Sequence, residues 1–408
     1  MKSLLLTALL LCSIAATADT PRANLTGTVV DTAGNPLPGV TVMVYHAGVK
    51  VGYSTFCPSC YQDCGKRVVT DAKGAFEIKD LAGDLWFTLL AARDGYVSQI
   101  TKSIDPEKNP SVSLKLAAKP PTTNFSGTVR GRVVEADGSP VRDAIVTPLG
   151  LEVDGSSIYG SPDGLEPIAT TNQQGEFDLS FNKPSPRMLL SVEARALAPK
   201  VLILETGPER HTVTLSDGAT VTGRLVASGK PVPNAQVGLA PMHPLLEGDH
   251  LKISGDPYDE IRIGTDADGR FTVTNVPAPV DWYLYAKMES VSSLGATSPI
   301  EVKVAKDGQA LQVRDLVLKR GYRVRGTVVA GDGKPIAQGM HVSISSTIVA
   351  DSQTVPLASD GHFEFANLPP GKYTMWTSVK GYDEDSQDIT IIDRDLDGFA
   401  STINPTAP

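Results

Sequence analysis

The stretch Thr70-Asp-Ala-Lys-Gly-Ala-Phe76 decides the fold of this chain. Its Asp opens a tight turn, because the side-chain oxygen can accept a hydrogen bond from the backbone two residues on. Its Gly supplies the left-handed residue that closes the turn. The Phe then begins a strand in which it and the residue two positions later face the same side. The stretch therefore predicts a β-hairpin with one buried face.

The hairpin motif recurs three times along the chain. The further copies lie at Thr171–Leu179, at Thr265–Val273 and, in a looser form, at Ser359–Phe365. In the last copy Ala358 stands where the others have the turn-opening Asp or Asn, so the geometry of that turn is expected to differ.

A second motif precedes every copy of the hairpin. It is a strand that runs into a Gly turn followed by Pro, and it starts at Gly27, Gly131, Gly223 and Gly326. Two motifs in a fixed order, four times over, indicate tandem repeats. Their spacing of about 90 to 105 residues is that of whole domains, so we expect four tandem modules.

Short strands and regular turn signals predict an all-β chain of four tandem β-sandwiches with about seven strands each. The modules are assigned to residues 19–118, 126–217, 218–320 and 321–396, after a signal peptide at 1–18 and before a tail at 397–408. Residues 119–125 form an extended Pro/Thr linker. Because only module one is followed by a linker, we expect module one to move while modules two to four form a semi-rigid array.

The N-terminus has the features of an export signal. Met1-Lys2 is followed by the apolar run Leu4–Leu11, and Ala16-Thr-Ala18 fits a cleavage site of small residues. No other segment approaches the roughly 20 apolar residues that cross a bilayer as a helix. We therefore expect a secreted or periplasmic chain without a transmembrane segment.

The composition argues against two classes of partner. The formal net charge is −9 at pH 7, which disfavours nucleic acid and anionic membrane surfaces. Aromatic residues make up only 6% of the chain, so the aromatic strips of many sugar-binding faces are not expected. The cores should instead be built from Val, Leu, Ala and Ile.

Together the motifs resemble a known family. The order Gly-x-Val, Gly-x-Pro and Thr-Asp-x-x-Gly-x-Phe, with a later strand ending in Asp94-Gly-Tyr96 or Lys380-Gly-Tyr382, is similar to the carboxypeptidase regulatory-like domain. Leu368-Pro-Pro-Gly-Lys-Tyr373 matches that family's Leu-Pro-Pro-Gly-x-Tyr turn. The resemblance covers nearly all of the chain after residue 18. It implies seven-stranded prealbumin-like (transthyretin-like) sandwiches and an accessory role.

The motifs of enzymes that are built near this fold are missing from the sequence. None of the six histidines is followed by Glu three residues on, as a zinc carboxypeptidase requires, and no His-x-His pair of an intradiol dioxygenase is present. The chain also lacks the Gly-x-Ser-x-Gly nucleophile turn and a phosphate-binding Gly-Lys-Ser/Thr loop. We therefore predict that the protein is not an enzyme and has no catalytic residues.

All the cysteines after residue 18 lie in the long loop of module one. Export to an oxidising compartment favours a disulfide among Cys57, Cys60 and Cys64, with one thiol left over. Alternatively the three thiolates bind a metal, with His46 as the fourth ligand. The Cys-x-x-Cys spacing suits zinc, although the usual second pair is absent. A redox role is less favoured, because no thioredoxin-like βαβ pattern surrounds the motif.

Two further groups of side chains bear on function. Trp86, Trp282 and Trp376 occupy the same strand of modules one, three and four, which predicts that they pack in the cores. The loop of module three contains two histidines and the acidic run Gly255–Glu260. We interpret that run as a solvated loop in preference to a metal site.

The sequence favours an exported, non-enzymatic protein that acts as a spacer or binding scaffold at the cell envelope. Tandem sandwiches of this size are expected to form an extended rod that positions a partner, either a protein or a glycan. Two alternatives stay open. One is a carbohydrate-binding protein, which an exposed aromatic cluster would indicate. The other is a metal- or thiol-site protein that acts through Cys57, Cys60 and Cys64.

Overall fold

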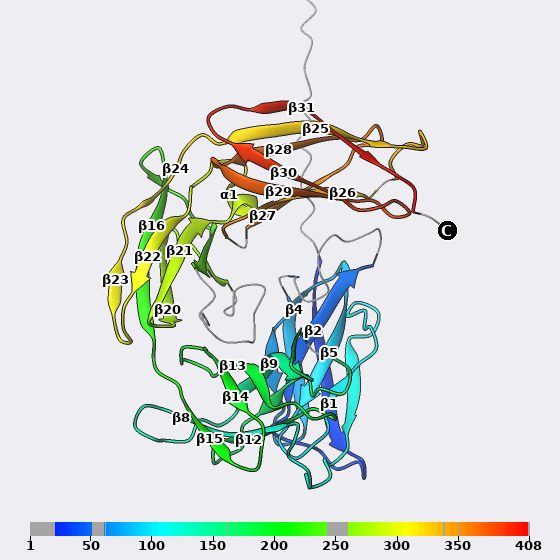
Figure 1. Cartoon of the computed structure of the whole chain (residues 1–408), viewed down its shortest axis with the longest axis vertical. Coiled ribbons are helices and arrows are strands. Elements are labelled where there is room, and N and C mark those ends of the chain that lie inside the picture. The colour runs from blue at the N-terminus through cyan, green and yellow to red at the C-terminus, as the bar shows by residue number, and fades with distance from the viewer. Residues whose placement is uncertain are drawn as a thin grey trace, which may run out of the picture.

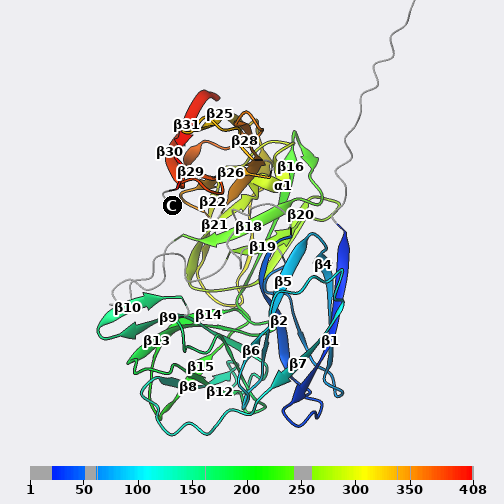
Figure 2. The ribbon, with the colours of Figure 1, turned by 90° about the vertical axis from the view of Figure 1, so that its right-hand side faces the viewer.

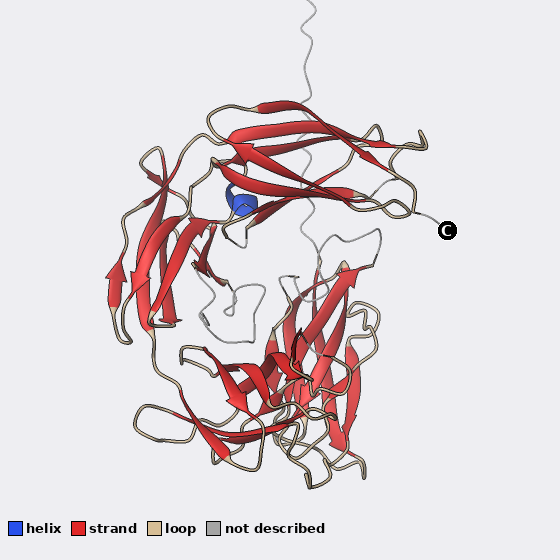
Figure 3. Cartoon of the chain, in the orientation of Figure 1, coloured by secondary structure: helices blue, strands red, loops and turns tan. Residues whose placement is uncertain are grey.

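The computed structural model describes residues 21–50, 61, 63–160, 162–242, 260–337, 339–349 and 351–406. In that part of the chain the regular structure is β-strand, apart from one short helix, α1 (Met288–Val291) (Figure 3). None of the described helical structure is long and apolar enough to span a membrane. The predicted signal peptide at 1–18 lies outside the described residues.

Module one is a sandwich of two sheets. Its strands are β1 (Arg22–Asp31), β2 (Thr41–Val49), β3 (Arg67–Val69), β4 (Ala75–Ala82), β5 (Leu85–Ala92), β6 (Gln99–Ile100) and β7 (Ser111–Leu116). One sheet has the order β4-β1-β7 and the other β3-β2-β5-β6. The first strand pairs antiparallel with β4 but parallel with β7. The seven-stranded sandwich predicted from the sequence is confirmed.

Module four repeats this topology. Its strands are β25 (Tyr322–Ala330), β26 (His341–Ser346), β27 (Ser352–Pro356), β28 (His362–Leu368), β29 (Gly371–Ser378), β30 (Asp385–Ile391) and β31 (Leu396–Ile403). The sheets have the orders β28-β25-β31 and β27-β26-β29-β30. The predicted tail at 397–408 is therefore wrong, because most of it forms β31. This strand pairs in parallel with β25 and buries Ile403 in the core.

Module two follows the same plan with one addition. Its strands are β8 (Thr128–Val134), β9 (Ile145–Val153), β10 (Ser156–Tyr159), β11 (Ala169–Thr170), β12 (Glu176–Ser180), β13 (Arg187–Glu193), β14 (Lys200–Glu205) and β15 (Arg210–Thr214). The sheets have the orders β12-β8-β15 and β10-β9-β13-β14, and β11 pairs with β9. The additional strand, β10, forms a hairpin with β9.

Module three differs mainly in its last strand. Its strands are β16 (Ala219–Ala227), β17 (Lys230–Pro231), β18 (Gln236–Pro241), β19 (Ile261–Gly264), β20 (Arg270–Val276), β21 (Val280–Ala286), β22 (Ile300–Val304), β23 (Ala310–Gln312) and β24 (Leu316–Leu318). The last strand is split into β23 and β24, which both pair in parallel with β16. Helix α1 follows β21.

The two repeated motifs interlock in every module. The hairpin Phe pairs with the leading Gly of the neighbouring antiparallel strand, as Phe76 does with Gly27 and Phe271 with Gly223. The ring lies so close that a Cβ added to the Gly would stand 2.3–2.6 Å from a ring atom in all four modules. Each Phe is at most 6% exposed. The predicted burial of Phe76, Phe177, Phe271 and Phe363 is confirmed, and it explains why a Gly leads every module.

The hairpin turn is held by its Gly and by the residue that opens it. Gly74 has a φ of 71° and accepts the N–H of Val29 at 2.8 Å. Asp71 accepts the N–H groups two and four residues on at 2.8 and 2.9 Å. In module four Ala358 cannot make these side-chain bonds. The backbone bond from Gly361 N–H to Ala358 O, at 2.8 Å, nevertheless keeps the turn.

The prediction that three Trp side chains pack in the cores holds for one of them. Trp282 is fully buried in module three, whereas Trp376 of module four is 47% exposed. Strand β29 places Tyr373 and Met375 in the core, so Trp376, one residue on, faces away from it. In module one the ring of Trp86 lies over Gly48 of the neighbouring strand and is half-buried.

The four modules trace an open arc instead of the extended rod expected from the sequence (Figure 1). Module one lies side by side with module two (Figure 2). A buried apolar cluster joins them, with Leu90 and Ala92 from module one and Ile145 and Ile168 from module two. The structure thus differs from the prediction of a freely moving module one, because apolar surface holds it against its neighbour.

Candidate functional site

The junctions between modules carry the most specific polar contacts, and a repeated β-bulge builds two of them. In modules one, three and four, the strand after the hairpin has one extra residue relative to the leading strand. The bulge residue is Asp80, Asn275 or Asn367, four positions after the hairpin Phe, with φ between 53° and 58°. Asn and Asp adopt this left-handed conformation more readily than other non-glycine residues.

Asn275 connects module three to module two. Its side-chain amide donates two hydrogen bonds, to Ala196 O of module two at 2.8 Å and to Asp217 O of the join at 2.9 Å. Gly218 lies beside it, and a Cβ there would stand 2.9 Å from the Asn275 carbonyl carbon. The bulge therefore directs one side chain at the preceding module and fixes how the chain enters module three.

Asn367 makes the equivalent connection between modules four and three. Its amide donates to Ser292 O, just beyond α1, at 2.6 Å. Its side-chain oxygen accepts the N–H of Gly321 in the join at 3.3 Å. An Asn at the same bulge position therefore makes contacts at two successive junctions, between modules two and three and between modules three and four.

Modules one and two do not use this device. In module one the bulge residue Asp80 is exposed and pairs with Arg22, with 2.9 Å between Asp80 Oδ1 and Arg22 Nε. That hydrogen bond holds the pKa of Asp80 below its usual range. Module two has Phe181 at the corresponding position, without a bulge in β12. The described residues of module two therefore contact module one in another way.

Apolar side chains reinforce the junction of modules three and four. Met288 belongs to α1 of module three but is buried in the core of module four. Val349 of module four packs in return against Ala240 and Tyr285 of module three. The exchange of side chains in both directions makes this junction resemble a domain core.

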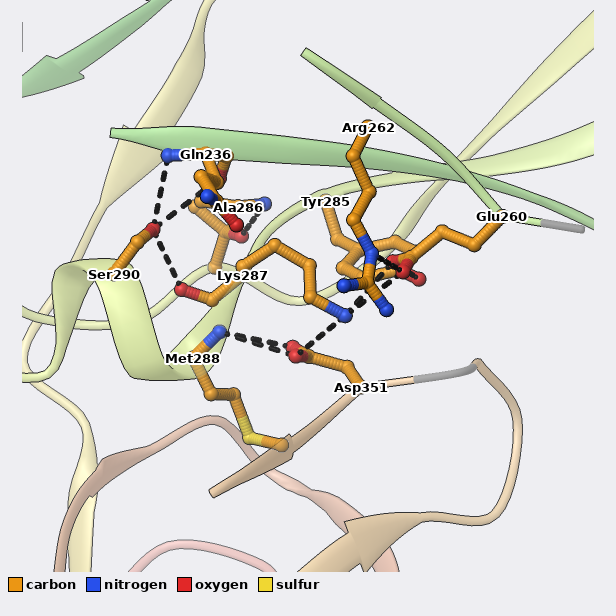
Figure 4. A network of polar contacts seen from close by, with 10 residues as sticks. Gln236, Glu260, Arg262, Tyr285, Ala286, Lys287, Met288, Ser290 and Asp351 are labelled. Atoms are coloured by element: carbon orange, nitrogen blue, oxygen red, sulfur yellow. Dashed lines mark hydrogen bonds and ion pairs between the residues drawn. The ribbon is translucent and has the colours of Figure 1, made fainter. Parts of the chain in front are cut away.

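A cluster of charged groups lies beside these apolar contacts (Figure 4). Lys287 Nζ lies 2.9 and 3.0 Å from the two carboxylate oxygens of Glu260 and 3.3 Å from Asp351 Oδ1 of module four. Their side chains are only 10%, 4% and 5% exposed. Arg262 and the hydroxyl of Tyr285 also donate to Glu260. The cluster therefore joins two modules through charges that are withdrawn from water.

Backbone groups fix the position of the cluster. The N–H of Met288 lies 3.0 and 3.3 Å from the two oxygens of Asp351. Burial raises the pKa of Asp351 to about 6, against the opposing effect of the Lys287 charge. Burial also raises the pKa of Tyr285, which therefore stays a hydroxyl donor. A carboxyl group with this pKa exists in both protonation states near neutral pH.

A partly open pocket of about 200 Å³ lies at the junction of modules one and two. Arg93, whose guanidinium lies over the Tyr96 ring, lines it from module one, and Glu166 lines it from module two. Lys119 of the linker also lines the pocket, and its Nζ lies 2.6 Å from Glu166 Oε1. Desolvation of Asp94, which lines this pocket, raises the pKa of its carboxyl group. The linker is thus part of the interface.

The structure places two of the four predicted metal ligands. His46 lies on β2 and is half-buried, which lowers its pKa. Cys64 packs against the core of module one, and burial raises the pKa of its thiol. Cys57 and Cys60 lie outside the described residues. Among the residues that are described, no group of three or more His, Cys, Asp or Glu side chains is arranged to hold a metal ion.

We propose that the cysteine loop of module one is closed by one disulfide or by a metal bound to Cys57, Cys60, Cys64 and His46. In the disulfide case one thiol should titrate in the untreated protein, and only reductant should release the others. In the metal case a chelator alone should release all three. Three freely reactive thiols in untreated, metal-free protein would contradict both forms of closure.

Comparison with known families identifies the modules at the two ends. The carboxypeptidase regulatory-like domain matches residues 24–118 and 323–399. The match covers most of modules one and four, and there it confirms the resemblance seen in the sequence. Modules two and three have the same order of core strands. No curated protein matches the chain.

Solved structures with a partial likeness include a Bacillus anthracis protein and two pilins. The Bacillus anthracis TIE protein is 10% identical over 90% of this chain and 69% of its own, with a TM-score of 0.19. A streptococcal ancillary pilin is 15% identical over 69% of this chain and 100% of its own, with a TM-score of 0.21. The minor pilin of Streptococcus agalactiae is 14% identical over 47% and 97%, with a TM-score of 0.24. TM-scores this low carry no information about the function of this chain.

Sequence reasoning missed the residues that build the junctions. The sequence predicts that Glu260 belongs to a solvated acidic loop, but its side chain is 4% exposed and forms an ion pair with Lys287. A signal for the bulges was present, since an Asn stands four residues after the hairpin Phe in modules three and four. Nothing in the sequence near Lys287 or Asp351 indicated that the two residues meet.

Proposed function

We propose that the protein is an exported, non-enzymatic scaffold that holds its four β-sandwich modules at fixed angles at the cell envelope. The main observation behind this proposal is that an Asn in the β-bulge makes contacts between modules at two junctions. Asn275 and Asn367 occupy equivalent positions in two modules. Asn275 donates two hydrogen bonds, and Asn367 donates one, to backbone carbonyl groups that precede its own module. A chain of independent domains has no need for such contacts, because its linkers allow relative motion by default.

The modules themselves support a non-catalytic role. Two of them match the carboxypeptidase regulatory-like domain. That resemblance implies an accessory role, in which a module supplies positioned surface in place of chemistry. The charged cluster at the junction of modules three and four is largely enclosed by protein, with its three central side chains at most 10% exposed. A cluster at this junction can fix the angle between modules three and four.

The partner of this scaffold is proposed to be a protein or a glycan at the cell envelope. One observation bears on a glycan. Trp376 is 47% exposed on the outer face of β29, where Ser343 and Ser386 stand opposite it on the neighbouring strands. Beside it, Thr374 donates to Asp388 at 3.0 Å. An exposed ring among hydroxyl and carboxylate groups is the kind of surface on which a sugar ring can stack.

The scaffold function is tested by a double variant, Asn275→Gly with Asn367→Gly. Glycine keeps the left-handed backbone and removes only the side-chain bonds. Each module should stay folded, with its stability changed by about 1 kcal/mol or less. Small-angle scattering should show a wider distribution of interdomain distances than in the wild-type chain.

The matched control is Asp80→Gly, which alters the same bulge in module one, where Asp80 contacts Arg22 and Lys66 of its own module. This variant should leave the scattering curve unchanged. An unchanged curve for the double Asn variant as well would count against fixed angles as the basis of function.

A further inference from the structure

The charged cluster at the junction of modules three and four contains more than a rigid spacer requires. An apolar contact of the same size is often at least as stable as a buried ion pair, because charges lose their hydration on burial. Met288 and Val349 already supply apolar contacts there. The cluster nevertheless brings an amine, Lys287, and two carboxyl groups, Glu260 and Asp351, together out of water.

The same arrangement places the reactants of an amide condensation in contact. Lys287 Nζ lies 3.3 Å from Asp351 Oδ1, so nitrogen and carboxyl carbon are held side by side. Such positioning replaces the improbable encounter of two groups in solution. Glu260 lies 2.9 Å from the same nitrogen and can take up a proton from it.

The surroundings also suit the carboxyl group to the reaction. A neutral carboxylic acid is the better electrophile, and burial keeps part of the Asp351 population neutral near pH 6. The N–H of Met288 lies 3.0 Å from Asp351 Oδ2 and can stabilise charge on that oxygen as the nitrogen attacks. Arg262 and Tyr285 hold Glu260 in place.

We propose that Lys287 and Asp351 condense to an intramolecular amide that joins modules three and four covalently. A bond forms between Lys287 Nζ and the Cγ carbon of Asp351, and one C–O bond of that carboxyl group breaks. Glu260 takes one proton from the ammonium group and passes it to the Asp351 carboxyl group, so that a neutral amine faces a neutral acid. The hydroxyl group of that acid then leaves with a second proton from the nitrogen as one water molecule. The third proton stays on the amide nitrogen. No oxidant, reductant or other reactant is needed.

This proposal rests on the proposed scaffold function, since a covalent link would prevent modules three and four from separating.

Module one contains an internal comparison. Lys50 contacts Asp105 at 2.5 Å and Glu107 at 3.0 Å, so the residue types are the same. There, however, Lys50 is 20% exposed, and its hydrogen bond holds the pKa of Asp105 below the usual range. Asp105 stays ionised, so we expect no amide at that pair.

The test is the intact mass of the full exported chain, measured under denaturing and reducing conditions. After allowance for thiol chemistry, the folded protein should be lighter than its sequence by the mass of one water molecule. Proteolysis should give one branched peptide that contains Lys287 and Asp351. Lys287→Arg keeps the positive charge but should restore the full mass, and Lys50→Arg should leave the loss of one water in place.

Glu260→Gln provides a second arm, because it preserves shape and removes the proton carrier. It should leave most of the chain at full mass while circular dichroism shows a folded protein. A wild-type chain at full mass, or a loss that survives Lys287→Arg, overturns the covalent link. Either result leaves the scaffold function to be judged separately by the scattering of the Asn variants.

Discussion

Replacing Phe271 with alanine is expected to lower the free energy of unfolding of module three by about 3–5 kcal/mol. The ring is 3% exposed and belongs to the core cluster that contains Trp282 and Leu225. It also covers Gly223, where no side chain could fill the space that it leaves. The loss thus combines the transfer of an aromatic ring to water with a cavity that the strands cannot close.

A matched control is Trp376→Ala, which removes a larger ring from an exposed position of the same fold. Its effect on the free energy of unfolding should be below about 1 kcal/mol, because nearly half of the Trp376 side chain is already exposed to water in the folded protein. Denaturant unfolding followed by intrinsic fluorescence and circular dichroism measures both variants. A loss below 1 kcal/mol for Phe271→Ala would show that the Phe–Gly contact does not hold the module together.

Replacing Lys287 with methionine is expected to weaken the docking of module four by roughly 3–5 kcal/mol relative to a chain in which Lys287 and Asp351 are still an ion pair. The substitution keeps the apolar stem of the side chain and removes the charge. Glu260 and Asp351 then remain buried with less positive charge between them. The corresponding change in module one, Lys50→Met, should cost less, because Lys50 is more exposed and water can replace it.

The effect of Lys287→Met should depend on pH in a defined direction. The pKa of Asp351 is raised in the docked state, so its protonation favours docking. That contribution is fully present below the ordinary carboxyl pKa of about 4 and is lost as the pH rises through about 6. The variant should therefore lose most stability above pH 7 and least near pH 4. A loss that does not change with pH would mean that Asp351 does not titrate at the junction.

The fold could be predicted because its signals are local. In three of the four modules Asp or Asn opens the turn and Gly closes it, both within five residues of the hairpin Phe. The reason for the leading Gly was not visible from the sequence. The ring that covers Gly131 comes from Phe177, and only the antiparallel register brings the two together.

The junctions could not be predicted because their partners lie in different modules. Asp351 meets Lys287 only after two sandwiches have folded and docked. The Pro-Pro linker was interpreted as a hinge from its composition, but Ile168 and Leu90 bury apolar surface across it. Trp376 was misplaced for a local reason, since the period of two in β29 puts Met375 inside and its neighbour outside.

The parallel pairing of the first and last strand in each module decides how the protein responds to a stretching force. In module one the chain enters along β1 and leaves along β7, which runs in the same direction, so it leaves at the opposite end. A pull on the two ends therefore slides the two strands past each other and loads all their hydrogen bonds at once. Module four shares this mechanical clamp through β25 and β31. In module three the clamp is divided between β23 and β24, and there the tension falls on two shorter sets of bonds.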